Sequence, residues 1–163
     1  MANETMNGLH VKLTIQGTVI GTDGRKQVVD ITYDRSFADG TGAQQCQSMF
    51  YDSARALNAT NETLDLDGLA DFQGATMSDT VGVKLMFVKN NSTTAGDEVT
   101  LFGGDFSSPM GDASDKIKVG PDGILLLISP VDGYTVAATT GDGLLVATDY
   151  NGTYDILLAT DNS

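Results

Sequence analysis

The chain has little of the residues on which many catalytic and metal sites depend. Its 163 residues include one cysteine, Cys46, one histidine, His10, and no tryptophan. A single cysteine excludes a disulfide within the chain and a zinc site built from cysteines. A single histidine cannot supply a histidine-rich metal site, and the lack of tryptophan removes the best stacking platform for sugars or single-stranded nucleic acid. We therefore expect no cofactor, no metal and no enzyme activity.

Long apolar runs and positive charges are also scarce. The longest uninterrupted apolar run covers residues 124–128, so we expect no bilayer span, and residues 1–13 lack the apolar stretch of a secretory signal. Nine Lys and Arg residues stand against 22 Asp and Glu, which gives a net charge of −13 and a pI near 4.1. Such an acidic surface repels DNA phosphates and anionic lipid headgroups. We expect neither nucleic acid nor a membrane as a partner.

The residues that are abundant favour strands and turns. The chain contains 19 Asp but 3 Glu, together with 19 Gly and 19 Thr. Glu is a good helix former, whereas Asp and Gly favour turns and the branched Thr side chain favours strands. The length fits one domain with a sizeable core. We predict an all-β fold: a jelly-roll-type β-sandwich of antiparallel strands over residues 9–163, preceded by a flexible N-terminal arm at residues 1–8.

Strand patterns and turn signals alternate along the chain. Apolar residues at every second position predict a strand from Leu9 to Ile15, and Asp23-Gly24 predicts a hairpin turn before a second strand around residues 29–33. Residues 35–45 have a loop-like composition, residues 47–57 favour a strand over a helix, and residues 69–72 fit one helical turn. Further strands are expected at residues 63–66, 81–89, 98–102, 116–119, 124–129, 134–138, 144–148 and 154–159. Short strands at such regular spacing are typical of a sandwich or barrel.

The apolar run at residues 124–128 predicts a strand that is covered on both faces. Its residues are Ile124, Leu125, Leu126, Leu127 and Ile128. One face of a strand in a single sandwich normally meets water. We expect another subunit to cover the second face, which makes this run a candidate oligomer interface; a loop or the N-terminal arm is the alternative cover.

The remaining polar patterns point to structural roles. His10 falls on the polar side of the first strand, and we expect it to be exposed. Cys46 has no cation nearby in sequence to activate its thiol, and we expect it to be a small buried apolar residue. Asp65, Asp67 and Asp71 superficially fit a calcium loop, but the fifth, sixth and twelfth positions of that motif are wrong here.

From about residue 48 onward the chain resembles the head decoration or cement proteins of tailed bacteriophages. The residues that carry the resemblance are TLDLDGL (63–69) with Gly74, VKLMFVKNNS (83–92), KIKVGPDGILLL (116–127), GYTV (133–136), GDGLLV (141–146) and TYDILLA (153–159). The family pattern has Pro-Gly-Gly where this chain has Pro121-Asp122-Gly123. These motifs describe strands and turns, and they contain no catalytic residues.

The resemblance implies a structural protein of the virion. Such a subunit is a jelly roll that forms trimers and bridges major capsid protein subunits on the outer capsid surface. In that setting the run at 124–128 and the C-terminal strand at 154–159 would bury surface between the subunits. The N-terminal arm would become ordered on the capsid through Asn3, Thr5, Met6 and Asn7.

Two other functions remain open at the level of sequence. The first is a tail- or fibre-associated module that binds a glycan or protein of the host surface. The second is a lectin-like hydrolase or carbohydrate-binding enzyme, which would need a cleft with converging Asp side chains. Aspartate is so frequent in this chain that no pair of them indicates such a cleft.

Overall fold

The structure, a computed structural model, describes residues 8–71, 74–102, 106, 108–112, 114–137 and 142–162. The described residues form strands and turns and contain no helix, which confirms the all-β prediction. The strands are β1 (Leu9–Ile20), β2 (Lys26–Asp39), β3 (Gln45–Cys46), β4 (Ser48–Asn58), β5 (Glu62–Asp65), β6 (Thr80–Asn90), β7 (Val99–Phe102), β8 (Lys116–Val119), β9 (Ile124–Ile128), β10 (Tyr134–Thr135), β11 (Gly143–Thr148) and β12 (Asn151–Asn162).

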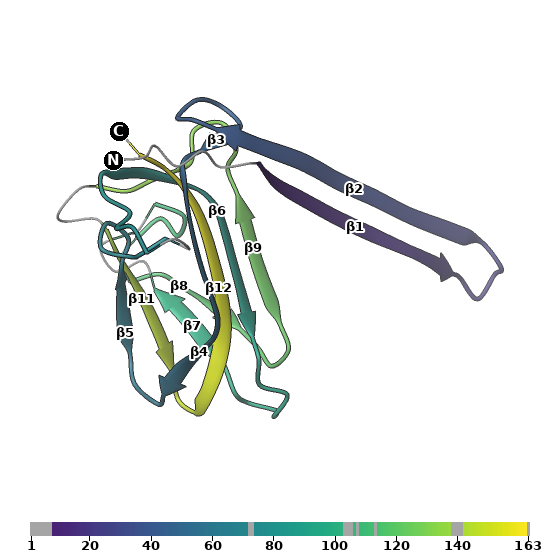
Figure 1. Cartoon of the computed structure of the whole chain (residues 1–163). Coiled ribbons are helices and arrows are strands. Elements are labelled where there is room, and N and C mark those ends of the chain that lie inside the picture. The colour runs from purple at the N-terminus through teal and green to yellow at the C-terminus, as the bar shows by residue number, and fades with distance from the viewer. Residues whose placement is uncertain are drawn as a thin grey trace.

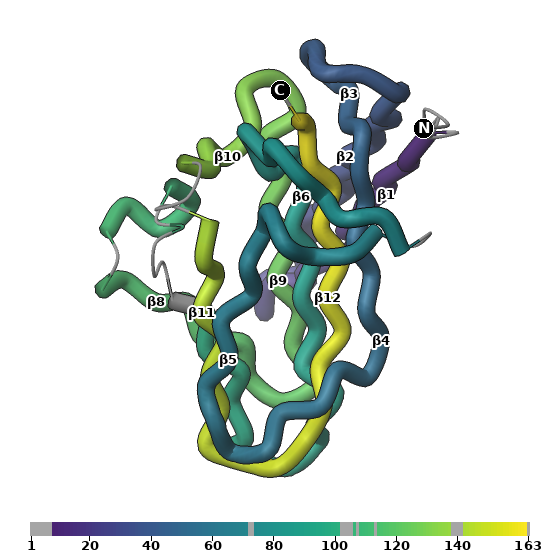
Figure 2. The backbone as a smooth tube through the Cα atoms, turned by 60° about the vertical axis from the view of Figure 1, so that its left-hand side comes forward, coloured from purple at the N-terminus to yellow at the C-terminus, as the bar shows by residue number. Residues whose placement is uncertain are grey.

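Two antiparallel sheets pack face to face as a sandwich (Figure 2). The first, here called the long sheet, has the order β10-β6-β12-β4, and β9 pairs with β6 on the same side as β10. The second, the short sheet, has the order β5-β11-β7-β8. The predicted sandwich of antiparallel strands is therefore present, and it is built from β4 to β12.

Alternation along the central strands β6 and β12 builds the core between the sheets. Met86 and Val88 of β6, and Ile156 and Leu158 of β12, point into this core and are fully buried. The residues between them face the opposite side of the long sheet. On that outer side a smaller apolar cluster forms around Leu85 and Ala159 with the neighbouring strands.

The strands β1 and β2 form a two-stranded antiparallel ribbon that extends away from the sandwich (Figure 1). Their pairing is unbroken from Leu9↔Phe37 at the sandwich to Ile20↔Lys26 at the far end. The hairpin turn predicted at Asp23-Gly24 is confirmed: Gly24 has a φ of +77°, and its N–H donates to the Gly21 carbonyl at 2.9 Å. We call residues 9–39 the ribbon.

Two local predictions were wrong. The loop expected at residues 35–45 begins later, because β2 continues to Asp39 and pairs with the start of β1. Cross-strand pairing and the burial of Phe37 override the loop-like composition there. The helical turn expected at residues 69–72 is replaced by an isolated β-bridge between Ala70 and Thr76, and residue 72 lies outside the described residues.

Candidate interaction surface

The register of the ribbon separates its side chains into an apolar and a polar face. Odd-numbered residues of β1 pair with odd-numbered residues of β2, so both sets point to the same side. The apolar face consists of Leu9, Val11, Leu13, Ile15, Gly17 and Val19 opposite Phe37, Arg35, Tyr33, Ile31, Val29 and Gln27. The polar face consists of His10, Lys12, Thr14, Gln16, Thr18 and Ile20 opposite Ser36, Asp34, Thr32, Asp30, Val28 and Lys26.

Polar side chains pair across the polar face. His10 is exposed, as predicted, and its Nε2 lies 2.7 Å from Oδ1 of Asp34. The hydrogen bond from His10 lowers the pKa of Asp34. Gln16 donates to Asp30 at 3.2 Å. These contacts link the two strands and are open to water, so we assign this face to the solvent side of the ribbon.

The apolar face anchors the ribbon at its base. Leu9, Val11 and Phe37 pack on the outer side of the long sheet, where Phe37 is 1% exposed. Phe37 forms one cluster there with Cys46, Leu85 and Ala159, and the partly buried residues Leu9, Val11, Phe87, Leu126, Ile128 and Leu157 pack against it. The sequence predicted that both faces of the strand at 124–128 are covered. The ribbon base covers part of the outer face.

Cys46 lies in this anchored base and is fully buried, which confirms the prediction of a small apolar residue. Burial raises the pKa of its thiol to about 12, and the nearby carboxylates of Asp161 and Asp39 act in the same direction. The thiolate is the reactive form of cysteine. Cys46 is consequently an inert part of the packing at neutral pH.

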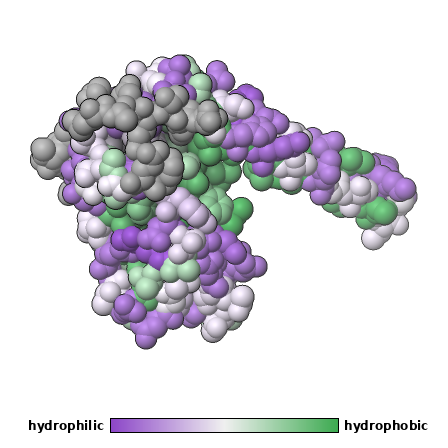
Figure 3. Space-filling view, viewed as in Figure 1, coloured by the Kyte–Doolittle hydropathy of each residue, from purple (hydrophilic) through white to green (hydrophobic). Residues whose placement is uncertain are grey.

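Beyond its base the apolar face of the ribbon is open. Ile15 is 49% exposed, Ile31 55% and Val19 63%. At the far end the polar face also carries apolar side chains, because Ile20 is 62% and Val28 71% exposed. Apolar surface is visible along the ribbon and where it meets the sandwich (Figure 3). A two-stranded hairpin is only marginally stable in water by itself, and contiguous exposed apolar surface marks an interaction site.

A second apolar area lies on the outer side of the long sheet, beside the ribbon base. Leu126, Phe87, Leu157 and Tyr51 are directly paired across β9, β6, β12 and β4, so their side chains form one row. The first three are partly buried, and Tyr51 is 53% exposed. We call this set the sheet row.

The structure divides the predicted interface at 124–128 between two faces. Leu125 and Leu127 pack against the core of the sandwich, whereas Leu126 and Ile128 pack against the outer cluster. Ile124 is 60% exposed. Only the residues of the outer face can meet another molecule, and they join the apolar area of the sheet row.

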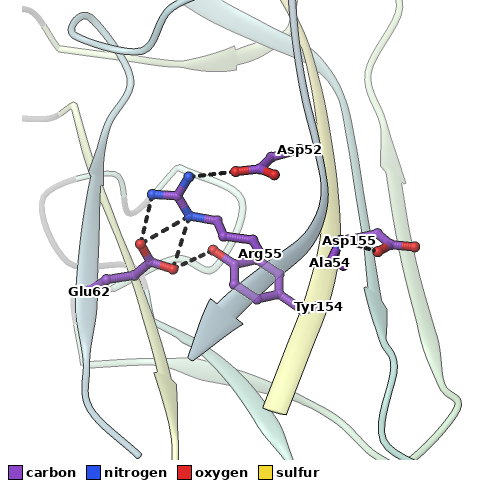
Figure 4. Close-up of polar contacts among 6 residues, drawn as sticks. All are labelled: Asp52, Ala54, Arg55, Glu62, Tyr154 and Asp155. Carbon is purple, nitrogen blue, oxygen red and sulfur yellow. Dashed lines mark hydrogen bonds and ion pairs between the residues drawn. The ribbon is translucent and has the colours of Figure 1, made fainter. Parts of the chain in front are cut away.

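A polar cluster ties the two sheets together (Figure 4). Arg55 of β4 donates to Glu62 of β5 at 2.8 Å and to Asp52 at 2.8 Å, and the Tyr154 hydroxyl donates to Glu62 at 2.7 Å. Hydrogen bonding to Glu62 raises the pKa of Arg55, and burial raises the pKa of Tyr154. Both groups are thus held in their protonated forms, which suits a structural tie.

A β-bulge places Arg55 in this cluster. The register between β4 and β12 shifts between Tyr154 and Ile156, and Ala54 has a φ of +56°. The Ala54 N–H donates to Asp155 at 2.8 Å, which lowers the pKa of that carboxyl. Bulges of this kind change the direction of a side chain next to a paired strand.

The aspartates of the rejected calcium motif bind backbone N–H groups instead. Asp65 accepts from Asp67 and Gly68, and Asp67 accepts from Thr80 at 2.8 Å. Asp71 accepts from Ala75. Within the described part of the chain, no group of three or more His, Cys, Asp and Glu residues could hold a metal ion.

Sequence reasoning missed a buried ion pair at the ribbon end of the sandwich. Lys84 Nζ lies 3.0 Å from Oδ2 of Asp161 and donates to the Val131 carbonyl at 2.7 Å. Lys84 is 2% exposed and Asp161 is 6% exposed. A lysine inside the apolar run of β6 was the available signal, but its partner lies far away in the sequence.

Residues 1–7 of the N-terminal arm, which include Asn3, Thr5, Met6 and Asn7, lie outside the described residues. Among the described residues no helix is long and apolar enough to cross a membrane. No family model matches the chain, and no curated protein or solved structure matches it.

Proposed function

We propose that this chain is a structural virion protein that decorates and stabilises the outer surface of a tailed-bacteriophage capsid. In this proposal it acts as a trimer that bridges major capsid protein subunits, without enzyme activity, cofactor, nucleic acid or membrane. The observation that carries the proposal is the ribbon, whose apolar face is open over most of its length. Such a surface is suited to binding another protein chain, which an assembly of several copies on a capsid requires.

The strand order supports the jelly-roll part of the proposal. Along the chain, β4 lies in the long sheet, β5 in the short sheet, β6 in the long sheet, and β7 and β8 in the short sheet. The chain then returns to the long sheet with β9 and β10, crosses to β11, and ends in β12 of the long sheet. Repeated crossing between two antiparallel sheets is how a jelly roll is connected.

Where the structure describes them, the motifs that resemble decoration proteins fall on strands and turns of this sandwich. The segment 116–127 contains β8, the turn and most of β9. Pro121-Asp122-Gly123 keeps the turn: Asp122 has a φ of +52°, and the Gly123 N–H donates to the Gly120 carbonyl at 2.9 Å. The departure from Pro-Gly-Gly is therefore compatible with a tight turn between β8 of the short sheet and β9 of the long sheet.

The charge of the chain supports a place on the outside of a capsid. A net charge of −13 opposes contact with a packaged genome, because DNA phosphates carry the same sign. On the outer surface that repulsion is absent. The N-terminal arm is assigned to the capsid contact, and an arm that becomes ordered on binding gains affinity when three copies bind together.

Capsid heads produced without this protein provide the test. Purified full-length protein is mixed with such heads, with isolated tails and with host cells, and each mixture is sedimented. We expect the protein to sediment with tailless heads. Sedimentation with tails or cells but not with heads would contradict the proposal and favour the receptor-binding function.

Deleting residues 1–8 tests the capsid contact separately. We expect the shortened protein to keep its oligomeric state and to sediment with heads less than the full chain. Unchanged attachment to heads would contradict the role of the N-terminal arm.

A further inference from the structure

We propose that the open face of the ribbon binds the outer side of the long sheet of a second copy of this chain. The ribbon of each copy would lie on the sheet row of the next, so that three copies close into a ring. The surfaces are defined without the capsid, whereas the number three rests on the proposed function.

The ribbon base already shows that the two surfaces fit chemically. Within one copy, Leu9 and Phe37 of the apolar face pack on Leu85 and Ala159 of the long sheet. Ile15 and Ile31 continue the same face, and Leu126, Phe87 and Leu157 of the sheet row pack against the same cluster, with the exposed Tyr51 at the end of the row. The open part of the ribbon and the sheet row therefore both adjoin the apolar contact that the ribbon base makes within one copy.

Within one copy, the open part of the ribbon and the outermost residues of the long sheet both stay uncovered. The ribbon projects away from the sandwich, so the side chains beyond Val11 stay about half exposed (Figure 1). On the sheet, Tyr51 and Ile124 remain 53% and 60% exposed. A second copy can cover the open part of the ribbon with its sheet, and a ring of copies leaves neither surface open.

Gly17 makes the apolar face of the ribbon accessible to a close partner. It lies opposite Val29, and a Cβ placed on it would meet no atom within 4 Å. The backbone is therefore uncovered at the centre of the apolar face. A protruding aromatic side chain such as Tyr51 fits a position of this kind.

Charge distinguishes a ribbon-to-sheet contact from a contact between two sandwiches. Residues 9–39 contain four of the nine Lys and Arg residues and four Asp, so the ribbon has no net charge. Residues 40–163 contain five Lys and Arg residues against 17 Asp and Glu. Two sandwiches therefore repel each other, whereas a ribbon that carries Lys12, Arg25, Lys26 and Arg35 approaches an acidic sandwich without that penalty.

The test is the mass of the full-length protein in solution. We expect the unchanged chain to have three times its monomer mass of 17.1 kDa. Ile15→Asp places a charge on the apolar face and should reduce the mass threefold, to the monomer. Thr14→Asp adds the same charge to the polar face and should leave the trimer intact. A monomeric unchanged chain, or equal dissociation by both substitutions, would contradict the proposal.

Substitutions on the sheet complete the test. Tyr51→Asp should also give monomers, and Ile124→Asp serves as a second variant if Tyr51→Asp fails to fold by circular dichroism. The Ile15→Asp chain keeps its sheet and the Tyr51→Asp chain keeps its ribbon. In a concentrated mixture of the two variants, the ribbon of the Tyr51→Asp chain can bind the sheet of the Ile15→Asp chain. We therefore expect a one-to-one dimer. If the mixture stays monomeric, or if Tyr51→Asp alone remains a trimer, ribbons do not bind sheets.

The sedimentation assay separates this inference from the proposed function. A trimer that depends on Ile15 but does not bind heads would contradict the capsid function and support the ribbon-to-sheet contact. A monomer that binds heads would support attachment to the capsid and contradict both the ribbon-to-sheet contact and the trimer. A dimer that Ile15→Asp and Tyr51→Asp each dissociate, but Thr14→Asp does not, would support the contact and contradict the trimer.

Discussion

The sandwich and the ribbon use the same strand chemistry with opposite results. In the sandwich, alternate side chains of β6 and β12 are buried between two sheets, and the residues between them are partly covered on the other side. In the ribbon, the alternation is as regular, but only the base is buried. The difference teaches that periodicity decides which face is apolar, whereas topology decides whether that face is covered.

The largest effect is expected at the buried ion pair of the sandwich. Lys84→Met removes the partner of Asp161 and leaves a carboxylate in a site almost without water. Breaking a buried pair in this way lowers the free energy of unfolding by about 3–5 kcal/mol. Urea unfolding measures it, with Lys26→Met on the exposed ribbon as the control, which should change little. The double variant Lys84→Met/Asp161→Leu should recover part of the loss; a still larger loss would contradict this explanation.

A matched pair of truncations compares the two regions directly. Leu158→Ala in the core should lower the free energy of unfolding by about 2–5 kcal/mol, because it leaves a cavity between the sheets. Ile15→Ala on the open ribbon should change it by no more than about 0.5 kcal/mol, measured at a concentration where the chain is monomeric. Equal losses at the two sites would show that the ribbon packs on the sandwich of its own copy.

The junction of the two regions should respond locally. The thiol of Cys46, with a pKa of about 12, should react slowly with iodoacetamide at pH 8. Phe37→Ala removes the side chain that covers this part of the cluster, and the reaction should become severalfold faster. The rate is followed by mass spectrometry. Tyr33→Ala, farther along the ribbon, is the control, and an equal acceleration there would indicate general unfolding.

The smallest effect concerns pH. The hydrogen bonds from Ala54 and Asn91 lower the pKa of Asp155 in the folded state. Because a lowered folded pKa stabilises the ionised form, the contribution is complete above the ordinary value of 3.8 and is lost as the pH falls through the folded pKa. Between pH 6 and pH 3 the urea midpoint of Asp155→Asn should fall less than that of the unchanged chain. Parallel curves would exclude this contribution.

The sequence predicted the fold better than it predicted the open surface. The alternation from Leu9 to Ile15 and the Asp23-Gly24 turn are local signals, and they gave the ribbon its strands and its hairpin. The end of β2 was missed because Phe37 is held by Leu9, a contact that composition does not report. The apolar run at 124–128 correctly indicated that both faces of this strand are covered. It did not indicate that the ribbon base of the same copy lies over the outer face.

The buried pair and the open surface depend on contacts between distant parts of the chain. Lys84 and Asp161 meet because β6 and β12 are neighbours in the long sheet. Val11 and Ile15 belong to the same alternation in the sequence, yet Val11 packs at the ribbon base and Ile15 is half exposed. No local pattern separates these two residues, because their exposure follows from where β3 and β4 lead the chain after the ribbon.

The single-layer construction of the ribbon has a mechanical consequence. A pair of strands without a covering layer twists and bends more readily than a sheet held in a sandwich. Its anchor lies at one end, where Leu9, Val11 and Phe37 pack on the sandwich and the end of β2 pairs with β3. If neighbouring copies are linked through such compliant elements, the angle between them can adjust. One amino-acid sequence can then fit both flatter and more sharply curved regions of a closed shell.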